Sequence, residues 1–168
     1  MGTISSEFGI RQLTPAIGAE LTGIDLSAPL SETILDAIYD ALIQHHVIFF
    51  PPQSISVSEH LAFAGSFGEP EPPHPVYPRH PESEHVVVLH NGPDNPPNTD
   101  GWHSDVTFQQ TPPFASVLWA RQVPRVGGDT LWTSLISAYD ALPKGIQSEI
   151  EGLNAVHDLG DYRNDFSH

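Results

Sequence analysis

The sequence contains no cysteine and few basic residues. Its 168 residues include 6 Lys plus Arg against 21 Asp plus Glu, which gives a formal net charge of −15. The absence of cysteine excludes disulfides, thiolate zinc sites and cysteine nucleophiles. Six scattered cations cannot form the basic stripe with which proteins neutralise nucleic-acid phosphates or anionic lipid headgroups. We therefore expect neither a nucleic-acid partner nor a membrane partner.

Long hydrophobic runs are also missing. No apolar stretch approaches the roughly 20 residues that span a bilayer. The segment Met1–Ile10 lacks the charged and apolar regions of a secretory signal. It begins with an N-myristoylation pattern, but no polybasic cluster follows to complete a membrane anchor. These observations lead us to expect a cytoplasmic protein.

Histidine, by contrast, is abundant, with 10 residues, and 39% of the chain is hydrophobic. The hydrophobic fraction is sufficient for the core of one domain, and no linker or repeat divides the chain. We therefore expect residues 1–168 to belong to a single domain without an internal boundary. Any metal ion would be held by imidazole and carboxylate groups, which iron, manganese and zinc accept as ligands.

Apolar spacing and capping residues predict helices that alternate with short strands. Ser31 can cap a helix, and the capping box Ser56–Glu59 opens a second helix that ends at Gly68. Two loops rich in proline and glycine, Glu69–Pro81 and Asn91–Gly101, interrupt the chain. The remaining predicted elements are strands at Val47–Phe50, Val86–Leu89, Ala115–Arg121 and Asp129–Thr133, and helices at Ser134–Leu142 and Ile146–Leu153. This pattern is typical of a mainly β fold with added helices, either a β-sandwich or a jelly roll, rather than a regular βαβ sheet.

The segment Trp102–Phe108 carries the clearest chemical pattern. Side chains two apart in an extended chain project to the same face, so His103 and Asp105 can contact one ion. A second histidine from elsewhere would complete a 2-His-1-carboxylate triad, which leaves three positions of an octahedral iron open. The spacing alone is a weak signal, because about 0.7 His-x-Asp pairs are expected by chance in this composition. Without further context, a surface loop with an unrelated histidine and aspartate stays open as the alternative.

Several blocks of sequence, taken in order, resemble a known family. They are Ile17–Gly23, His74–Pro78, Asp94–Pro97, Trp102–Phe108, Thr111–Pro113 and Gly127–Trp132. Through these blocks, the chain from about Leu13 to about Asp158 resembles the taurine dioxygenase family of Fe(II)- and 2-oxoglutarate-dependent oxygenases, which includes 2,4-dichlorophenoxyacetate dioxygenases. The resemblance implies a double-stranded β-helix, the cupin-like jelly roll, with added helices.

The resemblance also implies roles for residues that bind the metal and the cosubstrate. His103 and Asp105 match two Fe(II) ligands, and no catalytic residue beyond the metal ligands is implied. Thr130 matches a hydroxyl that helps to hold the distal carboxylate of 2-oxoglutarate. From the residue type alone, a β-branched strand residue is the favoured interpretation of Thr130.

A further set of residues matches the substrate pocket of the family. His74 and Tyr77 match positions that contact the sulfonate-bearing substrate, and Val106 matches an apolar wall. Thr99 departs from the taurine-specific pattern, which has asparagine there. A small sulfonate such as taurine is therefore the first expectation for the substrate, with an alkyl sulfate or an aryloxyacetate as alternatives.

The implied reaction is a hydroxylation that consumes O2 and 2-oxoglutarate and releases succinate and CO2. Hydroxylation of the carbon that bears a sulfonate also releases sulfite and an aldehyde. The partners are thus a small anionic substrate and O2, and a homo-oligomer is expected because family members commonly self-associate.

Two parts of the family site have no match in the sequence. They are the distal histidine ligand and the arginine clamps that neutralise the anions, and none of the 6 cations replaces them. Holding a dicarboxylate and a sulfonate in so acidic a protein requires concentrated arginine. We expect an incomplete jelly roll, the N-terminal portion of a longer catalytic domain and inactive alone. The rival classes are a cupin-type zinc hydrolase and, if the chain ends at His168, a non-catalytic binding module.

Overall fold

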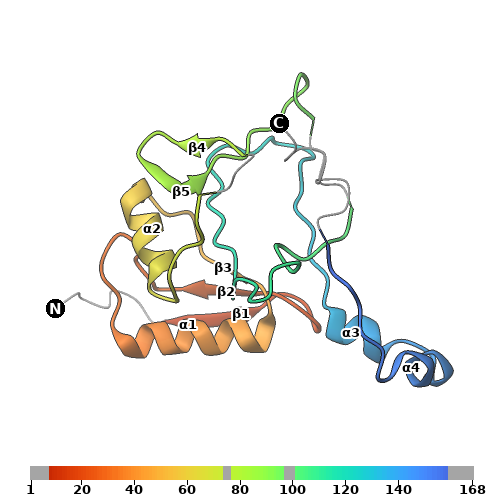
Figure 1. The fold of residues 1–168 in the computed structure, drawn as a ribbon. Helices are drawn as coiled ribbons and strands as arrows, with labels where there is room; N and C mark the ends of the chain where they lie inside the picture. The colour runs from red at the N-terminus through yellow and green to blue at the C-terminus, as the bar shows by residue number, and fades with distance from the viewer. Residues whose placement is uncertain (1–7, 74–76, 97–100, 159–168) are drawn as a thin grey trace. The chain divides into compact units, whose positions relative to one another are not determined.

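A computed structural model describes residues 8–73, 77–96 and 101–158 (Figure 1). The chain forms two units, and each unit is built from two separate stretches of sequence. Unit 1 comprises Met1–Glu59 with Ala120–Leu153, and unit 2 comprises His60–Trp119 with Asn154–His168.

A three-stranded sheet with the order β1–β2–β3 forms the centre of unit 1. β1 (Gly9–Gln12) pairs antiparallel with β2 (Ala19–Thr22), and β2 pairs parallel with β3 (Ile48–Phe49). Helix α1 (Glu32–His45) runs along this sheet (Figure 1). Its Ile38 and Leu21 of β2 are the largest fully buried side chains, and burying each contributes about 1.5–3 kcal/mol to folding. This small core holds the short strands in place.

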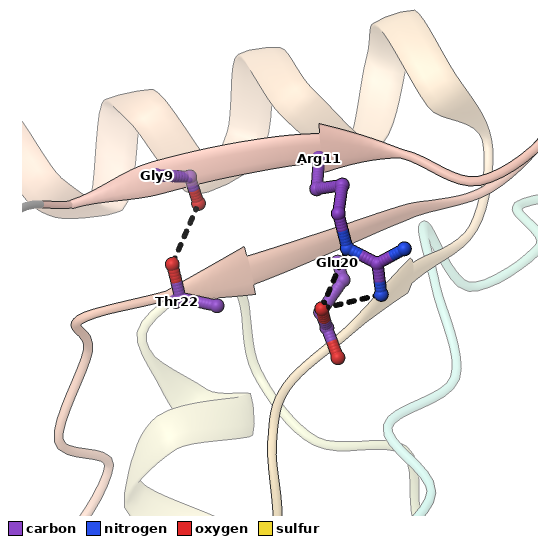
Figure 2. Close-up of polar contacts among 4 residues, drawn as sticks. All are labelled: Gly9, Arg11, Glu20 and Thr22. Carbon is purple, nitrogen blue, oxygen red and sulfur yellow. Dashed lines mark hydrogen bonds and ion pairs between the residues drawn. The ribbon is translucent and has the colours of Figure 1, made fainter.

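Side chains add two ties between β1 and β2. Arg11 lies opposite Glu20, and its Nε and one terminal nitrogen donate hydrogen bonds of 3.1 and 2.7 Å to the same oxygen, Oε2 (Figure 2). The hydroxyl of Thr22 donates a longer bond of 3.5 Å to the carbonyl of Gly9 (Figure 2). The antiparallel register is thereby supported at both ends of the pair.

Two helices of unit 1 begin at serine caps. Ser31 accepts a hydrogen bond from the backbone N–H of Ile34 at the start of α1, as the sequence predicts. Ser134 caps α3 (Leu135–Asp140) in the same way. α4 (Lys144–Ile150) is joined to α3 by Gln147, whose amide donates a bond of 2.8 Å to the carbonyl of Tyr139. Both predicted C-terminal helices are confirmed, although each is shorter than expected.

α2 (Val57–Gly65) begins at the end of unit 1 and continues into unit 2. Its predicted capping box is confirmed, because Ser56 Oγ accepts from the N–H of Glu59 while the Glu59 carboxylate accepts from the N–H of Ser56. Unit 2 also contains a hairpin of β4 (Arg79–His80) and β5 (Ser83–Val87). β5 overlaps the strand expected at Val86–Leu89 but starts and ends earlier.

The predicted strands at Ala115–Arg121 and Asp129–Thr133 are wrong for the described chain, which has no strand there. A strand exists only when a neighbouring chain completes its hydrogen bonds, and none of the described residues offers these segments a ladder partner. Their apolar side chains are correspondingly open, with Leu118 65% and Leu131 70% exposed. Because these two strands are absent, the described residues contain more helix than strand. The expectation of a mainly β fold is therefore not met among them.

None of the helices in the described ranges 8–73, 77–96 and 101–158 combines the length and the apolar character that a bilayer crossing requires.

Candidate metal site

His103 and Asp105 converge in unit 2. The Nε2 atom of His103 lies 3.2 Å from Oδ1 of Asp105. From the sequence we expected an extended segment, in which side chains two apart share a face, but the segment is not a strand. Residues 102–104 are irregular, and Asp105 opens a turn that runs to Phe108. The turn brings the two side chains together.

Each member of this pair is oriented by a second group. The Nδ1 atom of His103 lies 2.9 Å from the carbonyl oxygen of Gly101. Because a carbonyl only accepts, Nδ1 carries a proton, and Nε2 is therefore the nitrogen that a neutral ring can offer to a metal ion. On the other side, the hydroxyl of Ser116 donates a bond of 2.9 Å to Oδ2 of Asp105. This is the arrangement in which metal-binding histidines and carboxylates are usually held.

The geometry of the pair fits a metal ion. Two ligand atoms at about 2.1 Å from an octahedral ion, and at right angles to each other, are about 3.0 Å apart. The observed separation of 3.2 Å is close to this value. Two electron-pair donors facing each other at this distance also need a cation between them, either a proton or a metal ion. The side chains are 56% and 55% exposed, so the pair is accessible.

The described residues supply only these two ligands. No group of three or more His, Asp or Glu side chains able to hold a metal occurs among residues 8–73, 77–96 and 101–158. The described part of the chain therefore offers two adjacent side chains that could hold a metal ion.

Val106 directly follows the pair and has a backbone φ of 53°. A β-branched residue rarely adopts this left-handed conformation, so the turn is strained at this point. Val106 is half-buried. The next residue, Thr107, has its hydroxyl 2.8 Å from Nδ1 of His157, which ties the turn to the segment 154–158 of the same unit.

The other predicted site residues are distributed differently. Tyr77 is half-buried and lies in unit 2 just before β4, whereas His74 and Thr99 fall outside the described residues. Thr130 is exposed and belongs to unit 1. The structure thus brings together His103, Asp105 and Val106 and does not by itself join Thr130 to them.

Sequence analysis missed Ser116 and the carbonyl of Gly101 as partners of the pair. A backbone carbonyl leaves no signal in the sequence. Ser116 is a single hydroxyl within the largely apolar segment Ala115–Leu118, and it lies 11 positions from Asp105, so no spacing rule connects the two. Only the folded chain shows the contact.

Comparison with known proteins places this geometry in context. The chain is 36% identical over 154 residues to an alkylsulfatase of Acinetobacter baylyi, covering 91% of the chain and 48% of that protein. It is 35% identical over 152 residues to an alpha-ketoglutarate-dependent sulfate ester dioxygenase of Pseudomonas putida, covering 90% and 50%. Among solved structures, a taurine dioxygenase of Burkholderia xenovorans matches with a TM-score of 0.74 and 35% identity over 86% of the chain and 51% of that structure.

The chain spans about half the length of these relatives. Residues 9–168 match the taurine catabolism dioxygenase family TauD/TfdA. The match contains the His103–Asp105 pair and nearly the whole described chain. The chain therefore belongs to the TauD/TfdA family of taurine catabolism dioxygenases.

Proposed function

We propose that this chain is the N-terminal portion of a single catalytic domain with Fe(II)- and 2-oxoglutarate-dependent dioxygenase activity. The observation that carries the proposal is the separation of 3.2 Å between His103 Nε2 and Asp105 Oδ1, within a chain of the TauD/TfdA family. The names of relatives add support, since the Pseudomonas putida protein is called alpha-ketoglutarate-dependent, alpha-ketoglutarate being 2-oxoglutarate.

His103 and Asp105 would hold the iron. A third ligand would come from the part of the catalytic domain that corresponds to the half of the relatives not spanned by this chain. When bound, the iron and 2-oxoglutarate supply the oxidation that converts a substrate C–H bond and O2 to an alcohol, with succinate and CO2 as the other products. The protein contributes binding, orientation and exclusion of water. The bond between Nδ1 of His103 and the carbonyl of Gly101 would orient the ring so that Nε2 is the nitrogen offered to the metal.

Four residues would contact the organic molecules, and the first binds the cosubstrate. Thr130 offers a hydroxyl to the distal carboxylate of 2-oxoglutarate. Gly127 and Gly128 precede it, and both have a left-handed backbone conformation. Other residues adopt this conformation only with strain, so the turn before Thr130 requires glycine at both positions. A Cβ atom on Gly128 would also lie 2.9 Å from Cγ of Pro124. The two glycines themselves carry no side chain that would obstruct a carboxylate bound at Thr130.

His74 and Tyr77 would donate hydrogen bonds to the substrate anion, and Val106 would form an apolar wall. The prolines next to His74 and Tyr77 support their assignment as hydrogen-bond donors, because a stiff loop loses little entropy when it binds an oxyanion. We propose a small sulfonate such as taurine as the first substrate class. Hydroxylation next to the sulfonate would yield an unstable product that separates into an aldehyde and sulfite.

A sulfate ester is the second candidate, favoured by the names of two relatives at 36% and 35% identity. Here hydroxylation of the carbon next to the ester oxygen would release an aldehyde and sulfate. Both candidates present a tetrahedral sulfur oxyanion to the same donors, so they share one recognition chemistry.

The jelly roll belongs to the same proposal. Segments 115–121 and 129–133 are apolar, extended and without ladder partners among the described residues. Strands from the remaining half of the domain would pair with them and cover their exposed side chains. Self-association and a cytoplasmic location, which we expect from the sequence, stay predictions.

The experiment uses the full-length natural protein under anaerobic conditions. Addition of Fe(II) and then 2-oxoglutarate is expected to give a visible charge-transfer band, which the variant His103→Ala loses. Absence of the band in the unaltered protein would reject the proposed chemistry. Succinate production is then measured with sulfonates, alkyl sulfates and aryloxyacetates, and a preference for aryloxyacetates would reject a sulfur oxyanion as the substrate. Turnover without oxygen would instead indicate a hydrolase.

A further inference from the structure

The hydroxyl of Ser116 contacts only one of the two carboxylate oxygens of Asp105. Ser116 Oγ donates to Oδ2 at 2.9 Å, while Oδ1 faces Nε2 of His103 at 3.2 Å. The two oxygens of the carboxylate thus have different partners. A carboxylate without such a bond rotates freely and offers both oxygens to a cation.

We propose that Ser116 is a positioning residue that keeps Asp105 a one-oxygen ligand. This inference rests on the proposed metal site. A six-coordinate ion held by three protein atoms has three open positions. If Asp105 bound through both oxygens, it would occupy one of them. The remaining two would not accommodate a chelating 2-oxoglutarate together with O2.

The location of Ser116 supports this role. It lies in the irregular segment 115–119 of unit 2, outside the turn that carries Asp105, so the contact joins two separate stretches of backbone. Among the described residues, Asp105 accepts no side-chain hydrogen bond besides that of Ser116, apart from its contact with His103. Both side chains are exposed, so water competes for the carboxylate. The hydroxyl therefore selects an orientation and contributes little to overall stability.

The number of water molecules on a bound ion measures the open positions directly. Full-length protein is loaded with Mn(II) alone, and the enhancement of water-proton relaxation gives the number of exchanging waters on the ion. The matched variants are Ser116→Thr, which keeps the hydroxyl, and Ser116→Val, which has nearly the same shape without it. Both residues suit an extended segment, and the exposed position of Ser116 leaves room for a methyl group.

We expect about three waters on Mn(II) in the unaltered protein and in Ser116→Thr. In Ser116→Val we expect about two, which lowers the relaxation enhancement per bound ion by about one third. Ser148→Ala, which removes an exposed serine hydroxyl from α4 in unit 1, should match the unaltered protein. Near-ultraviolet circular dichroism verifies that each variant is folded.

Equal water numbers in Ser116→Thr and Ser116→Val would overturn the role of Ser116 while leaving the metal site intact. A loss of water in both variants would overturn it too, because the hydroxyl would then not be the cause. Failure of the unaltered protein to bind Mn(II) would overturn the proposed metal site, and this inference with it. The two failures are therefore distinguishable in one experiment.

Discussion

The imidazole of His60 lies against the indole of Trp119, with ring centroids 5.7 Å apart and planes inclined by 59°. Its Nε2 donates to the carbonyl oxygen of Val117 at 3.1 Å, which fixes the other nitrogen, Nδ1, as an acceptor. Nδ1 is buried and receives no hydrogen bond in the described structure. α2 is thereby joined to the segment 115–121 through a neutral histidine.

This arrangement predicts a dependence of stability on pH. Burial lowers the pKa of His60 below its ordinary value of 6.5, and the bond to Val117 only partly opposes the shift. The folded state therefore binds fewer protons than the unfolded state, so the contribution of His60 is complete above pH 6.5 and is lost as the pH falls below it. Urea unfolding at several pH values should show a smaller loss of stability in His60→Gln, which keeps a donor for Val117. The exposed His90→Gln serves as the control, and identical slopes in both variants would contradict the prediction.

Substitution of Gln53 is expected to lower the free energy of unfolding more than the partial exposure of this side chain suggests. Its amide accepts from the N–H of Leu26 at 3.3 Å and donates to the carbonyl of Ile24 at 3.1 Å, and both of these residues are buried. Gln53→Ala leaves two backbone groups without partners, so we expect a loss of about 1–3 kcal/mol in the free energy of unfolding. Chemical denaturation measures it. The exposed Gln122→Ala should cost less than about 0.5 kcal/mol, and equal costs would show that the amide does not act as a clamp.

The Arg11–Glu20 pair predicts a small and salt-sensitive contribution. The side chains are 66% and 30% exposed, and both nitrogens of Arg11 bond to a single oxygen instead of forming a parallel fork. A double-mutant cycle with Arg11→Ala and Glu20→Ala should give a coupling energy of about 0.2–1 kcal/mol. The coupling should decrease when the salt concentration is raised. A coupling that does not respond to salt would mean that the pair is shielded from solvent.

The strained turn at Val106 predicts an unusual response to glycine. Val106→Gly relieves a left-handed conformation that costs about 1–2 kcal/mol in other residues. This gain offsets the greater freedom of glycine in the unfolded chain. At Val123, which is 70% exposed and has no positive φ, the same substitution gives no relief. Unfolding by urea should therefore show Val106→Gly to be more stable than Val123→Gly by about 1 kcal/mol. The reverse order would remove the argument for strain.

The sequence predicted those elements whose signals are local. The serine caps at Ser31 and Ser56 marked the starts of α1 and α2, because a cap is complete within four residues. The end of α2 was less well predicted, since Gly65 and not Gly68 closes the helix. The convergence of His103 and Asp105 was also anticipated, although a turn and not strand alternation produces it.

Features that depend on distant partners were not predictable in this way. β1 and β2 were not predicted, because each has only four residues and they become strands through pairing with each other. The segments 115–121 and 129–133 have strand-like composition but lack ladder partners in the described chain. The contact of Ser116 with Asp105 depends on how two loops fold together. Amino-acid composition carries no information about which distant segments contact each other in the folded chain.

The closeness in sequence of Gly101, His103, Asp105 and Ser116 has a consequence for synthesis on the ribosome. All four lie within 101–116, so their mutual contacts require only the closing of short loops, which costs little entropy. These contacts can therefore form while translation of later residues is still under way. The nascent polypeptide would then hold the two proposed ligands of a divalent ion next to each other before its synthesis is complete.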